Sequence, residues 1–438
     1  MKKILALLLT AVMVLGLFAG CAGSATPNET TNAPAQSDTT EASSEAAPEV
    51  KDITLKVWGP QEDQVDASSW LPTMCEQFNA AHPEWNITFQ YEVCSEGDAS
   101  KTVTQDTAAA ADVYMFANDQ LGTLVEAKAI AQLGGTYLDA VTSDNSASMI
   151  ASVTGTDGGV YGVPFTGNTW FMYYDKSVFT EDDVKSLDTM LEKGKVSFPL
   201  TNSWYIASFF FANGCGMFGD AGIDGSAGFD FGGEKSAAVA EYLVALNANP
   251  NFSVDADGAG LAGLRDGSVN AIFSGTWDAA AVREALGDNF AAAQLPTVTI
   301  GGEAKQMQAF AGSKAIGVNP NCQNMQAAVA LAVYLGSAEA QLAHYTMRGI
   351  IPTSLALTED PAIQADAVAL AQANTIANTS KVQPTISEMG SYWTPAENFG
   401  KAIVSGEVTA DNAAQKAEDL NAALNNTGLS LLSFRLRI

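Results

Sequence analysis

Residues 52–93 combine two periodicities, and this combination limits the chain to a small group of folds. Apolar residues occupy every second position in residues 52–58 and again in 87–93, which predicts two half-buried strands. Between them, apolar residues at positions 71, 74, 75 and 78 have helical spacing, and Pro83 follows. Two strands joined through a helix pair in parallel by a right-handed crossover, so the sequence predicts an α/β fold.

The alternation of strands and helices continues beyond this unit. Residues 112–116 are predicted to form a third strand, and a helical stretch follows as far as Ala129. Near the end of the chain, Ala413, Ala417, Leu420 and Leu424 have helical spacing after Thr409, which is predicted to be the N-cap. The region after residue 50 is longer than one hydrophobic core normally serves, so two lobes are expected.

The first 21 residues have the composition of an export signal. Lys2 and Lys3 precede an apolar run from residue 4 to 18, and a small-residue pair precedes Cys21. The apolar run is too short for a comfortable bilayer span. The segment resembles the bacterial lipoprotein signal, in which this cysteine carries lipid, although Phe18 stands where that motif usually has Leu. An ordinary secretory signal with a cysteine by chance is the alternative.

A polar segment follows Cys21. Residues 22–50 are mainly Ala, Ser, Thr, Pro, Asn and acidic residues, with no Lys, Arg or aromatic side chain. Such a segment cannot bury enough apolar surface to offset its ordering entropy, so a disordered linker is predicted. As a random coil it would span about 30 Å, enough to hold a folded body away from a lipid surface.

The charge of the chain limits its partners. Asp and Glu number 49 against 21 Lys and Arg, a net charge of -28, and removing Lys2 and Lys3 with the signal makes it -30. A chain this acidic repels phosphate backbones and anionic headgroups. Nucleic acid is therefore not expected as a partner, and membrane attachment is expected to come from the lipid on Cys21.

Four cysteines remain after Cys21, and they allow three disulfide connectivities. Cys75 and Cys94 are the nearest pair, on the predicted helix and the strand after it. A single bridge between them is possible in an oxidising compartment, and the sequence leaves it open. The other two are Cys215 and Cys322.

Motifs for metal, cofactor and enzyme chemistry are absent from the sequence. The only histidines are His82 and His344, with no HExxH or CxxC motif. Acidic stretches at 220–230 and 255–258 do not keep the order of a calcium loop. There is no GxSxG or P-loop motif. We therefore predict no metal, no cofactor and no enzymatic activity.

Four motifs in order carry a family resemblance over residues 52–425. They are residues 112–122 (DVYMFANDQLG), 160–165 (VYGVPF) with 173–176 (YYDK), 271–277 (AIFSGTW) and 349–353 (GIIPT). With them the chain resembles an extracellular solute-binding protein of an ABC importer, of the maltodextrin-binding type. The resemblance implies a periplasmic-binding-protein-like fold: two α/β lobes, a hinge of several chain crossings and a ligand cleft between the lobes. Residues 51–166 plus about 313–340 would form lobe 1, about 171–310 plus 345–428 lobe 2, and 429–438 an irregular tail.

The resemblance also implies a set of ligand-binding residues. Sugars need aromatic rings for their flat apolar faces and planar polar groups for their hydroxyls. Trp277 and Trp393 occupy positions where the maltodextrin-binding type has stacking tryptophans. The full implied set is Gln61, Glu62, Phe116, Asp119 and Gln120 from lobe 1, Asn168 and Trp170 at the first crossing, and Asn202, Trp204, Tyr205, Trp277, Trp393 and Glu397.

Several of these positions depart from the maltodextrin-binding pattern. Gln120 and Glu397 stand in place of Arg, and Asn168 and Asn202 in place of Glu, so a different, neutral saccharide is the hypothesis. Each residue also has a structural alternative. The tryptophans could be core residues, Asp119 could cap a helix, and the two asparagines could satisfy loop backbone.

The predicted function is that of a substrate-binding lipoprotein. It would capture a carbohydrate as a monomer, outside the cytoplasm on the bacterial cell membrane, and deliver it to the permease subunits of an ABC transporter. Two alternatives remain: a ligand-binding partner of a membrane sensor, and a secreted carbohydrate-active enzyme.

Overall fold

The computed structural model describes residues 50–220 and 222–435, with side chains described as far as residue 426. Cys21 and the predicted linker up to residue 49 lie outside the described residues, and so do residues 436–438. Among the described residues, no helix has both the length and the apolar character needed to cross a membrane.

The first lobe is built on a six-stranded sheet. Its strands run in the order β15-β14-β3-β1-β2, with β4 paired to β14. β1 pairs in parallel with β2, Ile53 opposite Ile87, which confirms the predicted strand, helix, strand unit. The strands are β1 (Lys51–Gly59), β2 (Trp85–Val93), β3 (Val113–Ala117), β4 (Val163–Asn168), β14 (Ala309–Val318) and β15 (Ser380–Val382).

The core of the first lobe lies between this sheet and its helices. Leu55 and Val57 of β1 are fully buried against Leu71 and Phe78 of helix α1 (Trp70–Ala81). Trp70 is fully buried, and its indole N–H donates to the carbonyl of Ala340. The apolar spacing read in the sequence therefore faces the sheet, as amphipathic packing requires.

The second lobe is built on a five-stranded sheet that is buried on both faces. Its order is β11-β5-β10-β6-β9. Successive residues of β5 enter different cores: Met172 belongs to one cluster, and Phe171 and Tyr173 to another. This follows from the two-residue repeat of a strand. The strands are β5 (Phe171–Asp175), β6 (Val196–Phe198), β9 (Phe252–Val254), β10 (Ala271–Ser274) and β11 (Phe290–Ala293).

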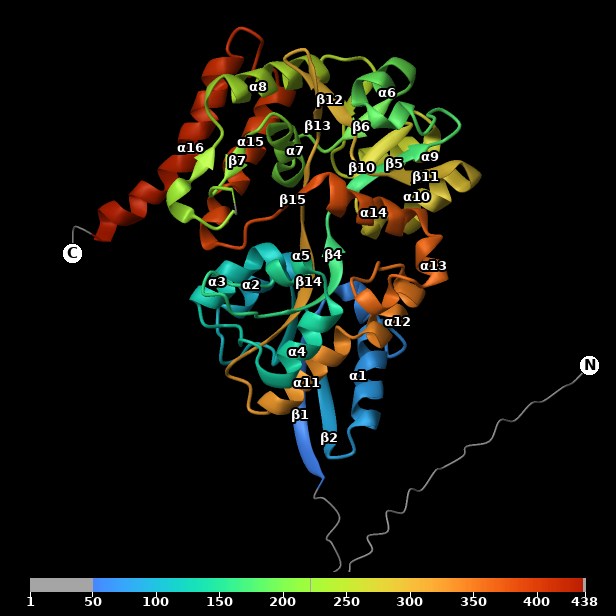
Figure 1. The fold of residues 1–438 in the computed structure, drawn as a ribbon, viewed down its shortest axis with the longest axis vertical. Helices are drawn as coiled ribbons and strands as arrows, with labels where there is room; N and C mark the ends of the chain where they lie inside the picture. The colour runs from blue at the N-terminus through green and yellow to red at the C-terminus, as the bar shows by residue number, and fades with distance from the viewer. Residues whose placement is uncertain (1–49, 221, 436–438) are drawn as a thin grey trace, which may run out of the picture. The chain divides into compact units, whose positions relative to one another are not determined.

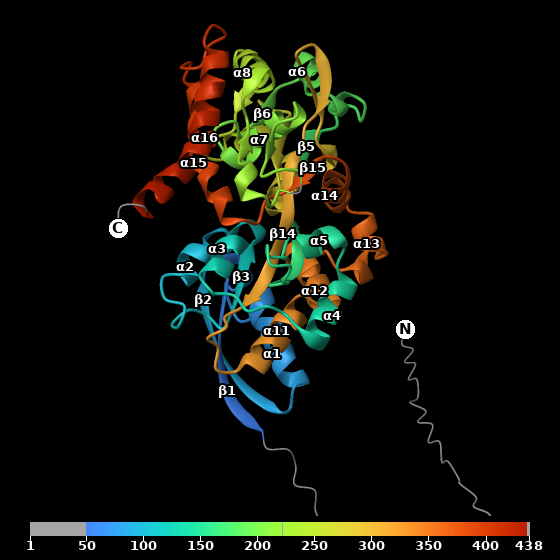
Figure 2. The same ribbon diagram turned by 60° about the vertical axis from the view of Figure 1, so that its left-hand side comes forward.

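The chain passes between the two cores at several places. β14 runs from one lobe into the other (Figures 1 and 2), with Phe310 in the core of the second lobe and Ala315 in that of the first. Residues 165–170 make an earlier crossing, because Phe165 belongs to the first core and Trp170 to the second. These crossings bring the carboxyl end of β4 beside the middle of β14, with Asn168 opposite Gly312.

Helices cover both sheets, and two small hairpins extend the second lobe (Figure 1). The hairpins are β7 (Gly216–Met217) with β8 (Phe229–Asp230), and β12 (Thr297–Ile300) with β13 (Glu303–Gln306). The remaining helices are α2 (Ala99–Val103), α3 (Leu121–Glu126), α4 (Gly135–Asp144), α5 (Ala147–Ala151), α6 (Leu187–Lys193), α7 (Ser203–Ala212), α8 (Gly233–Asn247), α9 (Ala259–Asp266), α10 (Ala279–Leu286), α11 (Met325–Leu335), α12 (Ala338–Arg348), α13 (Pro361–Gln364), α14 (Ala367–Asn378), α15 (Trp393–Val404) and α16 (Ala413–Arg435).

The C-terminal helix differs from the prediction at both ends. It begins at Ala413, and Thr409 is not its N-cap: the backbone N–H of Thr409 donates to Asn412 Oδ1, 2.8 Å away. The helix then continues to Arg435, through residues predicted to be an irregular tail. No proline interrupts this stretch, and its leucines favour helix.

The bridge that the sequence left open between Cys75 and Cys94 is not formed. All four cysteines after Cys21 are free thiols in the structure. Cys75 is fully buried among the apolar residues of the first lobe, and this burial raises the pKa of its thiol to about 12. Cys75 therefore behaves as a core residue.

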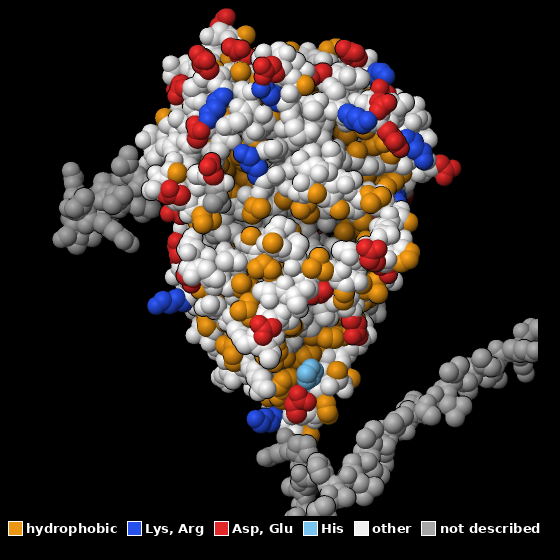
Figure 3. Space-filling model, in the orientation of Figure 1, with side chains coloured by type: hydrophobic (Ala, Val, Ile, Leu, Met, Phe, Trp, Pro, Cys, Tyr) orange, Lys and Arg blue, Asp and Glu red, His pale blue; other side chains and the backbone are white. Residues whose placement is uncertain are grey.

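One face of the molecule shows how charged and hydrophobic side chains are distributed on it. On the face shown in Figure 3, acidic and basic side chains are dispersed, and hydrophobic side chains gather across the middle of the face.

Candidate ligand-binding site

A pocket of about 450 Å³ is lined by residues from both lobes and from the segments that connect them. This volume lies in the range of small-molecule sites. The first lobe and β14 contribute polar and charged groups, and the second lobe contributes tryptophans. The lining residues are Glu96, Gly97, Ala117, Asp119, Gln120, Asn168, Trp204, Trp277, Lys314, Gln383 and Trp393.

Asp119 and Gln120 reach the pocket from the turn after β3. Gln120 Nε2 donates to Asp119 Oδ2 at 2.8 Å, while Ser100 donates its hydroxyl to Gln120 Oε1. This chain of donors fixes the orientation of the Gln120 amide. The walls of the pocket desolvate Asp119, which raises the pKa of its carboxyl above the ordinary value.

Close packing against the segment that follows β15 fixes the position of this turn. Helix α3 follows it, and a Cβ atom on Gly122 would lie 2.5 Å from the carbonyl oxygen of Thr385. Only glycine allows so close an approach of two backbones. The structural alternative for Asp119 does not apply, because no side-chain capping bond is made at the start of α3.

An ion pair lies on the same side of the pocket. Lys314 Nζ is 3.2 Å from Glu96 Oε1, and the two side chains are 29% and 10% exposed. Glu96 comes from the short helix η2 (Glu96–Asp98), and Lys314 from the middle of β14. This ion pair adds two charged side chains to the pocket that were not among the predicted site residues.

Three tryptophans form the opposite wall. The rings of Trp204 and Trp277 lie 6.0 Å apart at 35°, and the Trp393 ring packs edge-on against Phe310. Trp204 Nε1 donates to Gln383 Oε1 at 2.8 Å. Trp277 is 46% exposed, whereas tryptophan side chains are highly buried on average. The structure thus provides flat apolar surfaces of the kind that pack against sugar rings.

The structure brings six of the predicted site residues together at this pocket and places the others elsewhere. The six are Asp119, Gln120, Asn168, Trp204, Trp277 and Trp393.

The seven other predicted residues have visible structural roles or lie away from the pocket. Phe116, Trp170 and Tyr205 are buried in the cores. Asn202 is the N-cap of α7, where its side chain accepts from the Trp204 N–H. The remaining three are surface residues: Gln61 and Glu62 in the short helix η1 (Gln61–Asp63), and Glu397, which pairs with Lys401.

Sequence reasoning missed five lining residues: Glu96, Gly97, Ala117, Lys314 and Gln383. The position of Ala117 at the carboxyl end of a parallel strand, and of Glu96 shortly after another, was a usable signal. A single lysine in the apolar stretch 309–318 was another. No feature of the sequence indicated that Gln383 would line the pocket.

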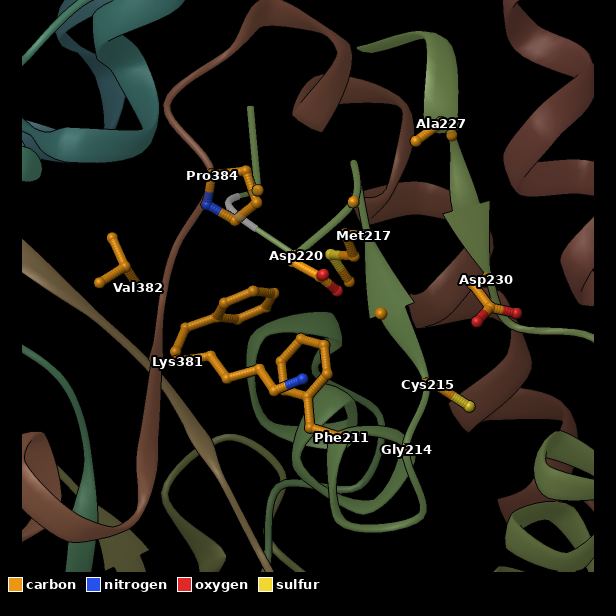
Figure 4. A pocket seen from close by; sticks show the side chains of 15 residues that line it. Phe211, Gly214, Cys215, Met217, Asp220, Ala227, Asp230, Lys381, Val382 and Pro384 are labelled. Atoms are coloured by element: carbon orange, nitrogen blue, oxygen red, sulfur yellow. The ribbon is translucent and has the colours of Figure 1, made fainter. Parts of the chain in front are cut away.

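A second, larger pocket of about 520 Å³ lies in the second lobe, near the β7 and β8 hairpin. Figure 4 shows the Lys381 side chain extending toward the ring of Phe211, with Met217 and Pro384 nearby, and Lys381 Nζ lies 5.2 Å from the Phe211 centroid. None of its lining residues comes from residues 50–166. Its contacts with the first-lobe sheet are limited to Phe310 of β14 and to Lys381 and Val382 of β15, so the first pocket, which is also lined from residues 96–120, is the better candidate.

The sequence of this chain matches the model of the bacterial extracellular solute-binding protein family over residues 73–371, and the chain belongs to that family. Family membership makes it a solute-binding protein of an extracellular type. Among its relatives is a maltooligosaccharide ABC transporter solute-binding lipoprotein of Streptococcus pneumoniae. It is 28% identical over 332 residues, which cover 70% of this chain and 75% of the relative.

Solved structures confirm the predicted two-lobe fold. A structure with acarbose is 54% identical in sequence and superimposes with a TM-score of 0.82, covering 85% of this chain and 99% of its own. The maltodextrin-binding protein MalE1 from L. casei BL23, without ligand, is 28% identical with a TM-score of 0.77, covering 85% of this chain and 98% of its own.

Proposed function

We propose that this protein captures a maltooligosaccharide in the pocket between its lobes and delivers it to the permease subunits of an ABC importer. One observation carries the proposal: three tryptophans of the second lobe and hydrogen-bonding residues of the first lobe line the same pocket. The similarity to the S. pneumoniae maltooligosaccharide transporter protein and to a structure with acarbose supports this class of ligand, in place of the different saccharide expected from the departures at Gln120, Asn168, Asn202 and Glu397.

The two walls match the two kinds of surface on a sugar. Each pyranose ring has flat faces of C–H groups, which pack on indole rings, and an edge of hydroxyls, which need donors and acceptors. The rings of Trp204 and Trp277 lie 6.0 Å apart, so two indoles contribute to the same part of the pocket wall. Asp119 and Gln120 provide acceptors and donors on the facing wall. A linear oligosaccharide can use both walls along its length.

Closure of the lobes follows from this division of contacts. A ligand that touches both walls binds the closed arrangement better than the open one, and this differential affinity shifts the population toward the closed state. A closed, loaded form is the state that a permease could distinguish from the empty protein.

Isothermal titration with maltotetraose tests the ligand. We expect saturable binding in the wild type and a loss of about 1–3 kcal/mol in Trp277→Ala, since a stacking ring is removed. Trp85→Ala removes an indole outside the pocket and should leave the affinity unchanged. No heat with maltotetraose, or equal losses in both variants, would remove the assignment. Recovery of intact maltotetraose after incubation would distinguish binding from hydrolysis.

We propose further that lipid on Cys21 holds the protein at the cell membrane, with residues 22–50 as the linker. The export signal and the cysteine at its end support this, and so does the lipoprotein name of the S. pneumoniae relative. Mass spectrometry of the mature N-terminus tests it. A diacylglyceryl-modified Cys21 is expected, and an unmodified N-terminus at any other residue would exclude the anchor.

A further inference from the structure

The charges of the ligand pocket are distributed unevenly. Glu96, Asp119 and Lys314 are its charged lining residues, and all three lie on the wall formed by the first lobe and β14. The other wall and the crossing segments contribute Asn168, Gln383 and three tryptophans, which carry no charge. With both carboxylates ionised and the lysine protonated, the pocket has a formal charge of minus one.

The single positive charge is already engaged. Lys314 Nζ is paired with Glu96 at 3.2 Å, and the Glu96 side chain is only 10% exposed. This ion pair compensates one of the two carboxylates. The other carboxylate, that of Asp119, is the one that determines the net charge of the pocket.

Asp119 has hydrogen bonding but no counter-ion. Its Oδ2 accepts from the neutral amide of Gln120, which is itself held by Ser100. Among the described residues, no Lys, Arg or His nitrogen lies within ion-pair distance of Asp119. Removing a carboxylate from water without a cationic partner costs free energy. A positively charged hydrogen-bond donor offsets this cost better than a hydroxyl does.

We propose that the pocket prefers an oligosaccharide carrying a protonated amine over a neutral oligosaccharide of the same length, and that Asp119 is the residue that selects it. This inference rests on the proposed function, because it concerns the same pocket. The amine would supply the missing positive charge, and the Glu96–Lys314 pair would remain intact. Anionic saccharides would be disfavoured by the same uncompensated carboxylate.

Acarbose and maltotetraose form a suitable pair of probes. They have similar length, and acarbose has a secondary amine in place of one glycosidic oxygen. Hydroxyl-bearing neighbours make this amine a weak base, so mildly acidic solution increases its protonated fraction. The charged groups that face a ligand in this pocket are Glu96, Asp119 and Lys314; the facing residues of β4, α7 and α15, together with Gln383 and Trp277, are neutral.

The experiment is titration calorimetry of the full mature chain with both probes at pH 6. We expect acarbose to bind about tenfold more tightly than maltotetraose, from the greater strength of a charged hydrogen bond. Asp119→Asn should reduce this ratio to near one, and added NaCl should reduce it in the wild type. Asp157→Asn removes a carboxylate outside the pocket and should leave the ratio unchanged.

A second measurement uses only the wild type, in case Asp119→Asn fails to fold. Titrations in two buffers of different ionisation enthalpy should show that acarbose takes up more protons on binding than maltotetraose does. Equal affinities, a ratio that survives in Asp119→Asn, or equal proton uptake would overturn the inference and leave the proposed function standing. Failure of both probes to bind would overturn the proposed function and this inference together.

Discussion

The indole ring of Trp277 folds back over Gly275, so closely that a Cβ atom on residue 275 would lie 2.1 Å from a carbon of the ring. Gly275 itself has an extended backbone, with φ of -106°, which any residue can adopt. The glycine is therefore required by the ring and not by the backbone. The Tyr173 hydroxyl donates to the carbonyl of Gly275 at 2.8 Å and holds this turn in place.

We expect Gly275→Ala to displace the Trp277 ring and to weaken maltotetraose binding by about 1–2 kcal/mol, because a stacking surface is lost. The free energy of unfolding should change by less, since Trp277 is 46% exposed and contributes little to the core. Titration calorimetry and thermal denaturation measure the two effects. Gly134→Ala is the matched control, because a Cβ atom there meets nothing within 4 Å. An unchanged affinity in Gly275→Ala would contradict the role of this contact.

The hydrogen bond between Trp204 and Gln383 gives a second prediction. Gln383 is 3% exposed, and its Oε1 accepts from the Trp204 indole at 2.8 Å. Gln383→Met keeps the volume but removes the acceptor, and we expect a loss of stability of about 1 kcal/mol. In a double-mutant cycle with Trp204→Phe, the two losses should not add, with a coupling of about 1 kcal/mol measured by urea denaturation. Additive losses would mean that the bond contributes nothing.

The α/β fold could be predicted from the sequence because its signals are local. The strands and helix of residues 52–93 are set by apolar spacing, and β1, α1 and β2 form where that spacing predicts. Position 116 shows the limit of such reasoning. All five residues of β3 are buried, so Phe116 enters the core, and the pocket begins only at Ala117, where the strand ends.

The charged wall of the pocket could not be predicted in the same way. Glu96 and Lys314 are 218 residues apart in the chain. They meet because β14 pairs with β3 and β4, and this register is fixed by tertiary packing that a single sequence does not reveal. Trp277 and Trp393 line the pocket, as the family resemblance implied: Trp277 follows β10 by three residues, and Trp393 is the first residue of α15.

The raised pKa of Asp119 predicts a conflict between stability and binding. A carboxyl whose pKa is higher in the folded state than in the unfolded state binds protons more tightly when folded. Its ionisation therefore lowers stability as pH rises from the unfolded pKa through the folded pKa, and the loss is complete above the folded value. We expect Asp119→Asn to be more stable than the wild type at pH 7 in the absence of ligand, and to lose less stability than the wild type as pH rises above the unfolded pKa.

Chemical denaturation of the wild type and of Asp119→Asn at several pH values measures this effect. Titration calorimetry with acarbose measures the accompanying loss of affinity. Asp157→Asn is again a suitable control, because hydrogen bonds from Tyr161 and Gly159 lower the pKa of that carboxyl, so its contribution has the opposite sign. A less stable Asp119→Asn protein at pH 7 would show that its ionised form is well compensated in the empty pocket.

A buried ion cluster in the first lobe predicts a large change in stability without a change in binding. Asp63 is 2% exposed; its Oδ1 lies 2.9 Å from His344 Nε2 and accepts from Arg348 Nη1 at 2.8 Å. The His344 ring stacks on Trp70 at 3.9 Å, so the cluster joins η1 to helix α12 through the core. Asp63→Ala would leave the Arg348 charge without its partner, and such a loss typically costs about 3–5 kcal/mol.

The control variant is Asp182→Ala. It breaks an exposed pair with Lys185 and should cost less than about 1 kcal/mol. Neither residue lines the ligand pocket, so maltotetraose affinity at 25 °C should stay within twofold of the wild type wherever the variant is folded. A small loss of stability in Asp63→Ala would mean that solvent reaches Arg348 and replaces the carboxylate.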